Sequence, residues 1–309
     1  MAYWVPWADA LEMAAGTAAI AGVTGRSRRP RAKAMAPYAQ ELTVILGLYA
    51  LWQYAGAFSI GKGSGAVARG RWIWNAERAL HVPSEAWFQH LVLGHRHLVQ
   101  LLNLYYVGVH VPALFGFLVW LFVRHRERYK PVRTVIALVT GASLLIALIT
   151  VAPPRLVPGL GMVDTGHLFG PTVYAGGASP GIDQLSAMPS LHVGWAVLVA
   201  AGVVWAGTSR WRWVFLAHPV ITVFCVVATG NHYWADVAAA LALCALFGAM
   251  VAWWHWRRRR RGWRESPTDE PGLALVEELA RCKVPTRVVD KARLADSPGR
   301  RRVRPCRST

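Results

Sequence analysis

The chain has 309 residues, of which 54% are hydrophobic and 16% charged, a composition that does not suit an ordinary soluble domain. Its formal net charge of +18 does not indicate nucleic-acid binding, because the basic residues cluster between apolar segments and near the carboxyl end instead of forming one basic domain. The cysteines show no Cys-x-x-Cys spacing, so they indicate neither a disulfide framework nor a zinc site built on cysteine. We therefore expect an integral membrane protein whose partners include membrane lipids and no nucleic acid.

Residues 1–40 form a basic amino-terminal segment that we interpret as peripheral to the membrane domain. Ala8–Val23 is rich in alanine and glycine, carries Glu12, and is followed rather than preceded by its basic cluster. These three features argue against a cleaved signal sequence. We predict a helix at the membrane surface for this stretch.

Residues 41–256 contain six apolar segments that approach the roughly 20 residues a helix needs to cross the hydrocarbon core of a bilayer. These segments are Leu42–Ile60, Leu98–Val123, Thr134–Ala152, Leu191–Gly207, Val214–Thr229 and Ala235–Trp256. Many tryptophans stand near their ends, as in the aromatic belts found at lipid headgroups. The predicted fold is an all-α integral membrane protein, a bundle of six transmembrane helices.

Four basic clusters alternate with the apolar segments in a way that puts them all on one side of the membrane. The clusters are Arg26–Lys33, Arg124–Arg133, Arg210–Arg212 and Arg257–Arg261. The positive-inside bias assigns this side to the cytoplasm, with both termini there, in a bacterial plasma membrane. Residues 257–309 are predicted to form a basic, largely disordered cytoplasmic tail whose first residues contact anionic lipid.

Two long connections lie on the opposite, non-cytoplasmic side. Residues 61–97 include an amphipathic stretch, Trp72–Gln89, which either lies at the membrane surface or forms a simple connecting helix. Residues 153–190 are rich in proline and glycine and carry little charge, and a loop of this length is usually functional or disordered.

His232 and Asp236 follow the Gly230-Asn231 break and are four residues apart, so they share one face if a helix begins there. Asn231 is a good N-cap for such a helix. A carboxylate one turn away can hold one imidazole nitrogen protonated and leave the other as a lone-pair donor, as a histidine nucleophile or base requires.

His192 lies three residues after Pro189, in the first turn of a predicted helix whose free N–H groups can bind phosphate. Ser190 adds a hydroxyl donor, and His192 is placed to protonate a leaving oxygen as a general acid. Arg155 ends the third apolar segment and offers a guanidinium for bidentate binding of phosphate. The connectivity returns these groups to the non-cytoplasmic face of the bundle, where we predict the active site.

Each of these features also has a simpler interpretation. Arg155 could be a headgroup anchor, and a His-x-x-x-Asp spacing is common by chance. His167, His192, His232 and Asp236 could in principle hold a catalytic zinc ion, although no His-Glu-x-x-His motif and no carboxylate-rich cluster for magnesium is present. We therefore predict no metal and no cofactor. Five of the histidines outside the two motifs are predicted to be interfacial or packing residues: His81, His90, His95, His97 and His110.

The two histidine motifs resemble the signatures of the type 2 phosphatidic acid phosphatase superfamily, particularly its inositolphosphorylceramide-synthase-like branch. Pro189–His192 is similar to the second signature, His232–Asp236 to the end of the third, and Pro153–Arg155 to the proline-rich first signature of that branch. The resemblance covers roughly Ala152–Ala240. It implies a six-helix fold, metal independence, a phosphohistidine on His232, orientation of this ring by Asp236, and protonation of the departing alcohol by His192.

The chain departs from the phosphatase branch at two phosphate-binding cations. The lysine of the first signature would fall in Ala147–Ala152, which is apolar, and Val226 stands where that branch has an arginine six residues before the nucleophilic histidine. The candidates to replace these cations are Thr229, Asn231, Arg71, Arg78 and Arg96. This departure favours the synthase-like branch and leaves open whether the acceptor is water or an alcohol.

Together these features predict a membrane-embedded phosphoesterase or phosphotransferase with catalytic His192, His232 and Asp236 and phosphate-binding Arg155, Ser190 and Asn231. It would transfer a phosphoryl or substituted phosphoryl group from a lipid phosphate to an alcohol, as in inositol-phosphate head-group transfer, or to water. The alternatives are a phosphatase of lipid phosphates or polyprenyl phosphates and, from another class, a non-catalytic lipid-phosphate transporter or binding scaffold.

Overall fold

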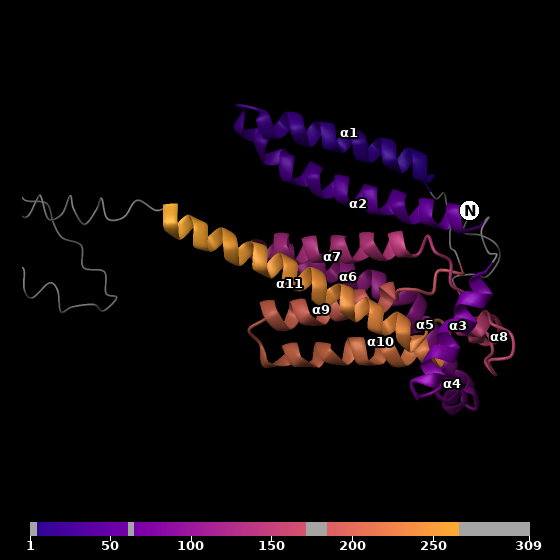
Figure 1. The fold of residues 1–309 in the computed structure, drawn as a ribbon. Helices are drawn as coiled ribbons and strands as arrows, with labels where there is room; N and C mark the ends of the chain where they lie inside the picture. The colour runs from indigo at the N-terminus through magenta and orange to yellow at the C-terminus, as the bar shows by residue number, and fades with distance from the viewer. Residues whose placement is uncertain (1–4, 61–64, 171–183, 266–309) are drawn as a thin grey trace, which may run out of the picture. The chain divides into compact units, whose positions relative to one another are not determined.

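In a computed structural model of the chain, residues 5–60, 65–170 and 184–265 are described, and they form helices joined by short connections (Figure 1). The chain divides into two units, Met1–Trp254 and His255–Thr309. The helices are α1 Trp7–Arg26, α2 Pro30–Ile60, α3 Ala66–Ala79, α4 Glu85–Leu93, α5 Arg96–Gly108, α6 His110–Arg124, α7 Arg126–Ile146, η1 Pro154–Leu156, α8 Thr165–Phe169, α9 Leu191–Ala206, η3 Arg210–Leu216, α10 Ala217–Ala228 and α11 Trp234–Glu265. The tail was predicted to begin at residue 257, but α11 continues to Glu265. Residues 266–309 of the predicted tail lie outside the described regions, as do residues 171–183 of the long outer loop.

The amino-terminal segment forms a helical hairpin with the first predicted span. Helix α1 packs along α2, where the Thr43 hydroxyl donates to Thr17 Oγ1 at 3.0 Å. Helix α2 contacts α7 in turn through Glu41, whose carboxylate lies 3.0 Å from the Arg133 guanidinium and accepts from the Tyr129 hydroxyl. The predicted span Leu42–Ile60 is therefore the second half of a longer helix.

The described part of the chain has three helical segments long and apolar enough to cross a membrane: Arg126–Ile146, Arg210–Ala228 and Trp234–Arg258. Helices α5 and α6 make a fourth if they form one span bent by 46°. The apolar α9 is shorter, at 16 residues. The protein is thus an all-helical membrane protein with three or four candidate spans among the described residues, and the predicted count of six is not confirmed. The predicted span Leu98–Val123 is broken between Gly108 and His110, so α5 and α6 are separate helices.

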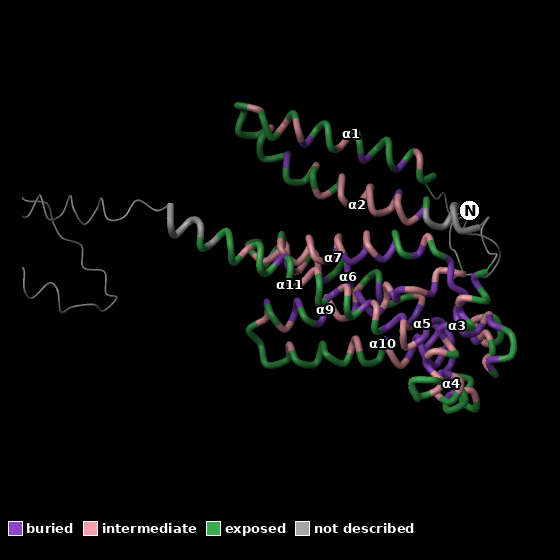
Figure 2. Tube along the Cα trace, in the orientation of Figure 1, coloured by how far each residue is buried: buried purple, intermediate pink, exposed green. Residues whose placement is uncertain are grey.

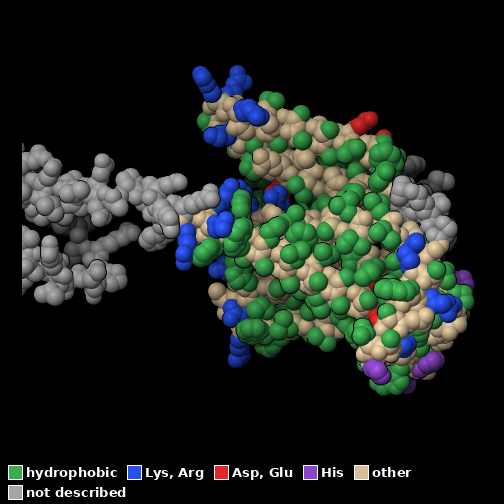
Figure 3. Space-filling model, viewed as in Figure 1, with side chains coloured by type: hydrophobic (Ala, Val, Ile, Leu, Met, Phe, Trp, Pro, Cys, Tyr) green, Lys and Arg blue, Asp and Glu red, His purple; other side chains and the backbone are tan. Residues whose placement is uncertain are grey.

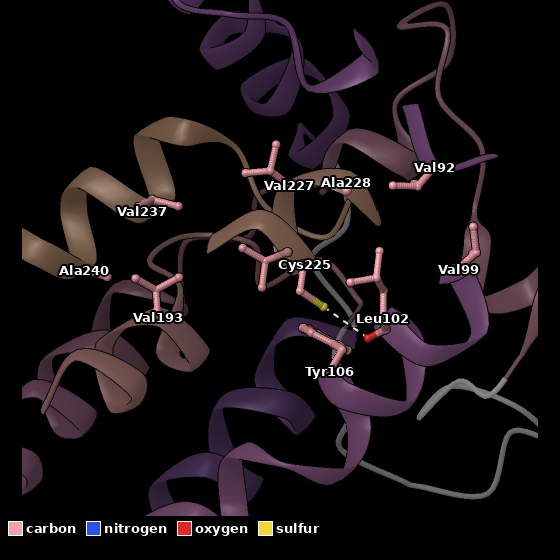
Figure 4. Packing of buried hydrophobic residues seen from close by; sticks show 11 residues of the cluster. Val92, Val99, Leu102, Tyr106, Val193, Cys225, Val227, Ala228, Val237 and Ala240 are labelled. Atoms are coloured by element: carbon pink, nitrogen blue, oxygen red, sulfur yellow. Dashed lines mark hydrogen bonds between the residues drawn. The ribbon is translucent and has the colours of Figure 1, made fainter. Parts of the chain in front are cut away.

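A buried apolar cluster joins the ends of the helices that carry the two histidine motifs (Figure 4). Val193 of α9 and Val237 of α11, each next to a motif residue, pack with Tyr106 of α5 and Cys225 of α10. The Cys225 thiol donates to the Leu102 carbonyl at 3.1 Å. In Figure 2 the buried residues concentrate at this end, whereas η3 and the first residues of α10 are mostly exposed. Such exposed apolar helix surface suits contact with lipid.

Most of the Lys and Arg side chains of the Met1–Trp254 unit lie at its other end, although Figure 3 also shows some at the end that holds α3 and α4. Figure 3 shows them over the turn between α1 and α2 and over the connection from α9 to η3. Arg128 from the start of α7 stacks on Trp205 at 5.1 Å and donates to its carbonyl, and Arg212 lies over Trp213 at 5.1 Å. These contacts put basic and aromatic groups together at one end, as expected at a lipid headgroup layer.

Candidate active site

Backbone contacts hold the two histidine motifs together at the beginnings of α9 and α11. The Ser190 N–H donates to the Asp236 carbonyl at 3.3 Å, and the Ala187 carbonyl, just before the first motif, lies 2.6 Å from His232 Nδ1. The two motifs thus lie together in the fold, although Ala187 and His232, which make the second of these contacts, are 45 positions apart in the chain.

The imidazole of His232 is fixed by two oxygen acceptors. Its Nδ1 lies 2.6 Å from the Ala187 carbonyl oxygen and 3.3 Å from Asp236 Oδ2. Because neither oxygen can donate, the hydrogen-bond network assigns the ring proton to Nδ1. Nε2 then carries the lone pair. His232 is 5% exposed and Asp236 fully buried, so the arrangement is well shielded from solvent.

The contact between His232 and Asp236 does not come from a shared helix face. Helix α11 begins at Trp234, so His232 lies before it, and the prediction that Asn231 caps this helix was wrong. Asp236 instead reaches back, its Oδ2 accepting from the Tyr233 N–H at 2.9 Å as the carboxylate of a capping box does. The Asn231 amide donates to Thr229 Oγ1 at 2.7 Å.

His192 lies in the first turn of α9, as predicted, and is held by aromatic rings. Its ring centroid is 4.2 Å from that of Tyr106 and 4.8 Å from that of His110, which meets it edge-on. The centroids of His192 and His232 are 6.2 Å apart. The two rings therefore lie close together although they come from different parts of the chain.

Ser190 is the N-cap of α9. Its Oγ accepts from the Val193 N–H at 3.4 Å, which leaves the hydroxyl hydrogen for another acceptor. The remaining N–H groups of this first turn, together with the positive end of the helix dipole, suit a bound phosphate.

Arg155 packs against the turn that precedes His232. Its N–H donates to the Gly230 carbonyl at 3.1 Å, and its Nε lies 3.4 Å from Asp164 Oδ2. Gly230 has a φ of +69°, and a Cβ there would lie 3.1 Å from the Cβ of Arg155, so glycine permits both the turn and this approach. The guanidinium is nearly buried, with a side chain 2% exposed.

The other three candidate cations, Arg71, Arg78 and Arg96, have surroundings that differ from those of Arg155. The Arg71 guanidinium donates to the Pro158 carbonyl, in the loop that follows Arg155. Arg96 is exposed at the beginning of α5. Arg78 lies 3.4 Å from Glu85 and 3.7 Å from Glu77, so its guanidinium pairs with a buried carboxyl cluster and not with the phosphate site.

Sequence reasoning missed the part of the site formed by His110 and its neighbours. His110 is buried, its Nε2 lies 3.2 Å from Thr222 Oγ1, and that oxygen lies 3.1 Å from the Tyr105 hydroxyl. The Tyr105 hydroxyl is in turn 2.6 Å from Nδ1 of His218. An ionisable residue inside an apolar segment was the available signal, but only the tertiary structure reveals its contact with His192.

The zinc set proposed as an alternative is not assembled. Among the described residues, no three His, Cys, Asp or Glu side chains are grouped so that they could hold a metal ion. His167, one of the four residues of that set, lies in the short helix α8.

Residues 71–250 match the family model of the PAP2 superfamily, and these residues include both histidine motifs and Arg155. Among curated proteins, the inositol phosphorylceramide synthase catalytic subunit aur1 of Schizosaccharomyces pombe is 31% identical over 88 residues. This stretch is 28% of the present chain and 20% of that relative, so the similarity spans only a small part of the synthase subunit. No solved structure matches the chain.

Proposed function

The chain belongs to the PAP2 superfamily, a family of membrane phosphatases and phosphotransferases, and on this premise we propose that it transfers a substituted phosphoryl group from a lipid phosphate through a phosphohistidine on His232. The observation that carries the proposal is the double anchoring of His232 Nδ1 by Ala187 and Asp236, with the His192 ring 6.2 Å away. An anchored Nδ1 leaves Nε2 as a nucleophile.

In the first step, Nε2 of His232 attacks phosphorus and the bond from phosphorus to the lipid oxygen breaks. His192 gives a proton to that oxygen as it departs. Asp236 stabilises the positive charge that develops on the His232 ring. Arg155, the Ser190 hydroxyl and the first N–H groups of α9 bind the phosphoryl oxygens, whose charge grows in the transition state.

In the second step, an acceptor hydroxyl attacks the phosphohistidine and gives its proton to His192. The bond from phosphorus to Nε2 breaks, and both histidines regain their starting states. The acceptor is an alcohol in head-group transfer and water in hydrolysis. The local similarity to the synthase subunit and the apolar Ala147–Ala152 segment support transfer to an alcohol.

The charge of the site also supports a substrate with one negative charge at phosphorus. Arg155 is paired with Asp164, and Val226 stands in place of a second cation. A phosphodiester carries one negative charge and needs less compensation than a phosphomonoester dianion. A phosphatase of lipid or polyprenyl monoesters would require more positive charge around the phosphate.

We further propose that the site faces away from the cytoplasm of a bacterial cell, with both termini on the cytoplasmic side. The concentration of Lys and Arg at the opposite end of the Met1–Trp254 unit supports this orientation (Figure 3).

Product analysis tests this function directly. Purified protein is incubated with phosphatidic acid, a polyprenyl phosphate or phosphatidylinositol, with and without a lipid alcohol, and the products are identified by mass spectrometry. We expect a head-group phosphate on the lipid alcohol when the diester is the donor. Rapid release of inorganic phosphate from the monoesters, without any transfer from the diester, would favour the phosphatase instead.

Arg155→Gln is expected to lower kcat/KM by roughly 30-fold, or about 2 kcal/mol, because a charge-assisted hydrogen bond to phosphate is lost. Arg155→Lys should lie between this variant and the wild type, since lysine keeps the charge but not the bidentate geometry. Asp164→Asn is the matched control, because it removes the ion pair and leaves the guanidinium in place. Unchanged kcat/KM in Arg155→Gln would remove Arg155 from the phosphate site.

A further inference from the structure

Two buried glutamates lie at the beginning of α11 and have no part in the reaction described above. Glu77 of α3 is 4% exposed and Glu85 of α4 is fully buried. Both belong to the outer connection whose sequence indicated an amphipathic segment. A carboxyl group is rarely buried unless its oxygens meet hydrogen-bond donors or a cation.

The two glutamates cap the first turn of α11 together with Asp236. Glu77 Oε1 accepts from the Ala235 N–H at 2.6 Å, and Glu85 Oε1 accepts from the Trp234 N–H at 3.4 Å. Asp236 Oδ2 accepts from the preceding N–H, that of Tyr233. Three consecutive N–H groups at this helix start thus each meet a carboxyl oxygen, although such groups have no partner within a helix.

Close packing of α3 brings Glu77 to this position. A Cβ at Gly70 would lie 2.6 Å from both the Ala152 carbonyl oxygen and the Tyr233 hydroxyl, so only glycine permits this approach. The Tyr233 hydroxyl donates to the same carbonyl at 2.9 Å. Helix α3 is therefore held against the residue that directly follows His232.

The charges of this cluster do not balance if every carboxyl is ionised. Among the residues that the structure describes, Arg78 is the cation that pairs with the cluster, 3.4 Å from Glu85 Oε2 and 3.7 Å from Glu77 Oε2, and its guanidinium also lies over Trp74. Burial, and next the hydrogen bond and charge of Glu85, raise the pKa of Glu77 to about 9. At neutral pH Glu77 is protonated and can donate to Glu85.

We propose that Glu77 and Glu85 are positioning residues that share one proton and hold the first turn of α11, and through it Asp236 and His232, in the geometry of the reaction. This inference rests on the proposed role of His232. Neither glutamate touches the substrate in this account. Their influence passes through the backbone of Trp234 and Ala235 to Asp236, the residue that follows.

The proton on Glu77 makes the arrangement sensitive to alkaline pH. A carboxyl whose pKa is raised on folding stabilises the fold fully below its unfolded value of 4.5, and this contribution is lost as pH rises toward about 9. The groups that face Glu77 are Glu85, Arg78, Asp236 and Tyr233, and loss of its proton adds a negative charge beside two other carboxyls. We expect kcat to fall as pH rises through about 9.

The variants Glu77→Gln, Glu77→Ala and Glu85→Gln test this inference, with the exposed Glu127→Gln as the control. Glutamine mimics the protonated acid, so Glu77→Gln should keep kcat at pH 7 within about twofold and lose the decline near pH 9. Glu77→Ala should lower kcat by about tenfold or more at every pH with a smaller change in KM, as expected for an uncapped and misplaced turn. The proposal would be overturned if the kcat of Glu77→Gln declined near pH 9 as that of the wild type does, or if Glu77→Ala had the kcat of the wild type.

A readout that needs no turnover separates this inference from the proposed function. The rate at which diethyl pyrocarbonate modifies His232, mapped by mass spectrometry, should rise several-fold in Glu77→Ala and stay unchanged in Glu77→Gln and Glu127→Gln. An unchanged rate in Glu77→Ala would overturn the positioning role. If that rate rises while His232→Ala retains full activity, the glutamates hold the turn and the proposed chemistry at His232 is wrong.

Discussion

Replacement of His232 by alanine is expected to lower kcat for lipid-phosphate turnover by about 10⁴-fold, because no phosphohistidine can form. The His232 ring is held by two hydrogen-bond acceptors at Nδ1 and by the turn at Gly230. We therefore expect no other nucleophile to take its place. The measurement is initial-rate kinetics in detergent micelles or proteoliposomes, with thermal unfolding of each variant recorded beside it.

The matched control for His232→Ala is His97→Ala, which removes an exposed imidazole from α5. This variant should keep its activity within about twofold, as surface substitutions usually do. Asp236→Asn should lie between the two, since it keeps an oxygen near Nδ1 but loses the charge that stabilises the phosphorylated ring. Turnover by His232→Ala within tenfold of the wild type would mean that phosphorus is attacked by another group.

His192→Gln is expected to lower kcat for a natural lipid phosphate by roughly 10²- to 10⁴-fold, the usual contribution of a general acid and base. A nitrophenyl ester of the same phosphate needs no proton on its leaving group. With this substrate the variant should release one nitrophenol per active site in a fast burst at nearly the wild-type rate. Turnover after the burst should be slow, because the acceptor hydroxyl then lacks its base.

The comparison of the two substrates isolates the proton transfer by His192 from any structural effect of the variant. A misfolded or displaced site would slow the natural and the nitrophenyl substrate by the same factor. Equal losses, or the absence of a burst, would therefore contradict the role of His192. The stack of His192 on Tyr106 is the contact most at risk in the variant, so its thermal stability must be compared with that of the wild type.

The sequence predicted the local features of the site and not the long-range ones. Ser190 and Pro189 are strong signals for the start of α9, and the structure has Ser190 as its N-cap. Asn231 is an equally good local signal, yet α11 begins at Trp234. Carboxyls from α3 and α4, about 150 residues away in the chain, cap that turn, and no local propensity contains such contacts.

The same limit applies to the spans and to His110. A hydropathy pattern indicates which segments are apolar but does not show that Leu98–Val123 bends by 46° near Gly108. That bend lies next to His110, which contacts both His192 and the chain of hydroxyls toward His218. An ionisable residue in an apolar segment could have been noted from the sequence, whereas its partners come from α9 and α10 and required the fold.

The most direct test of a covalent intermediate is to identify the phosphorylated residue. The His192→Gln variant is mixed with a labelled nitrophenyl ester of a lipid phosphate, quenched after the burst and digested for mass spectrometry. We predict one labelled site, His232, whose bond to phosphorus is cleaved by acid and stable in base. The double variant His192→Gln/His232→Ala should carry no label. A burst without any protein-bound label, or a label on another residue, would contradict the account.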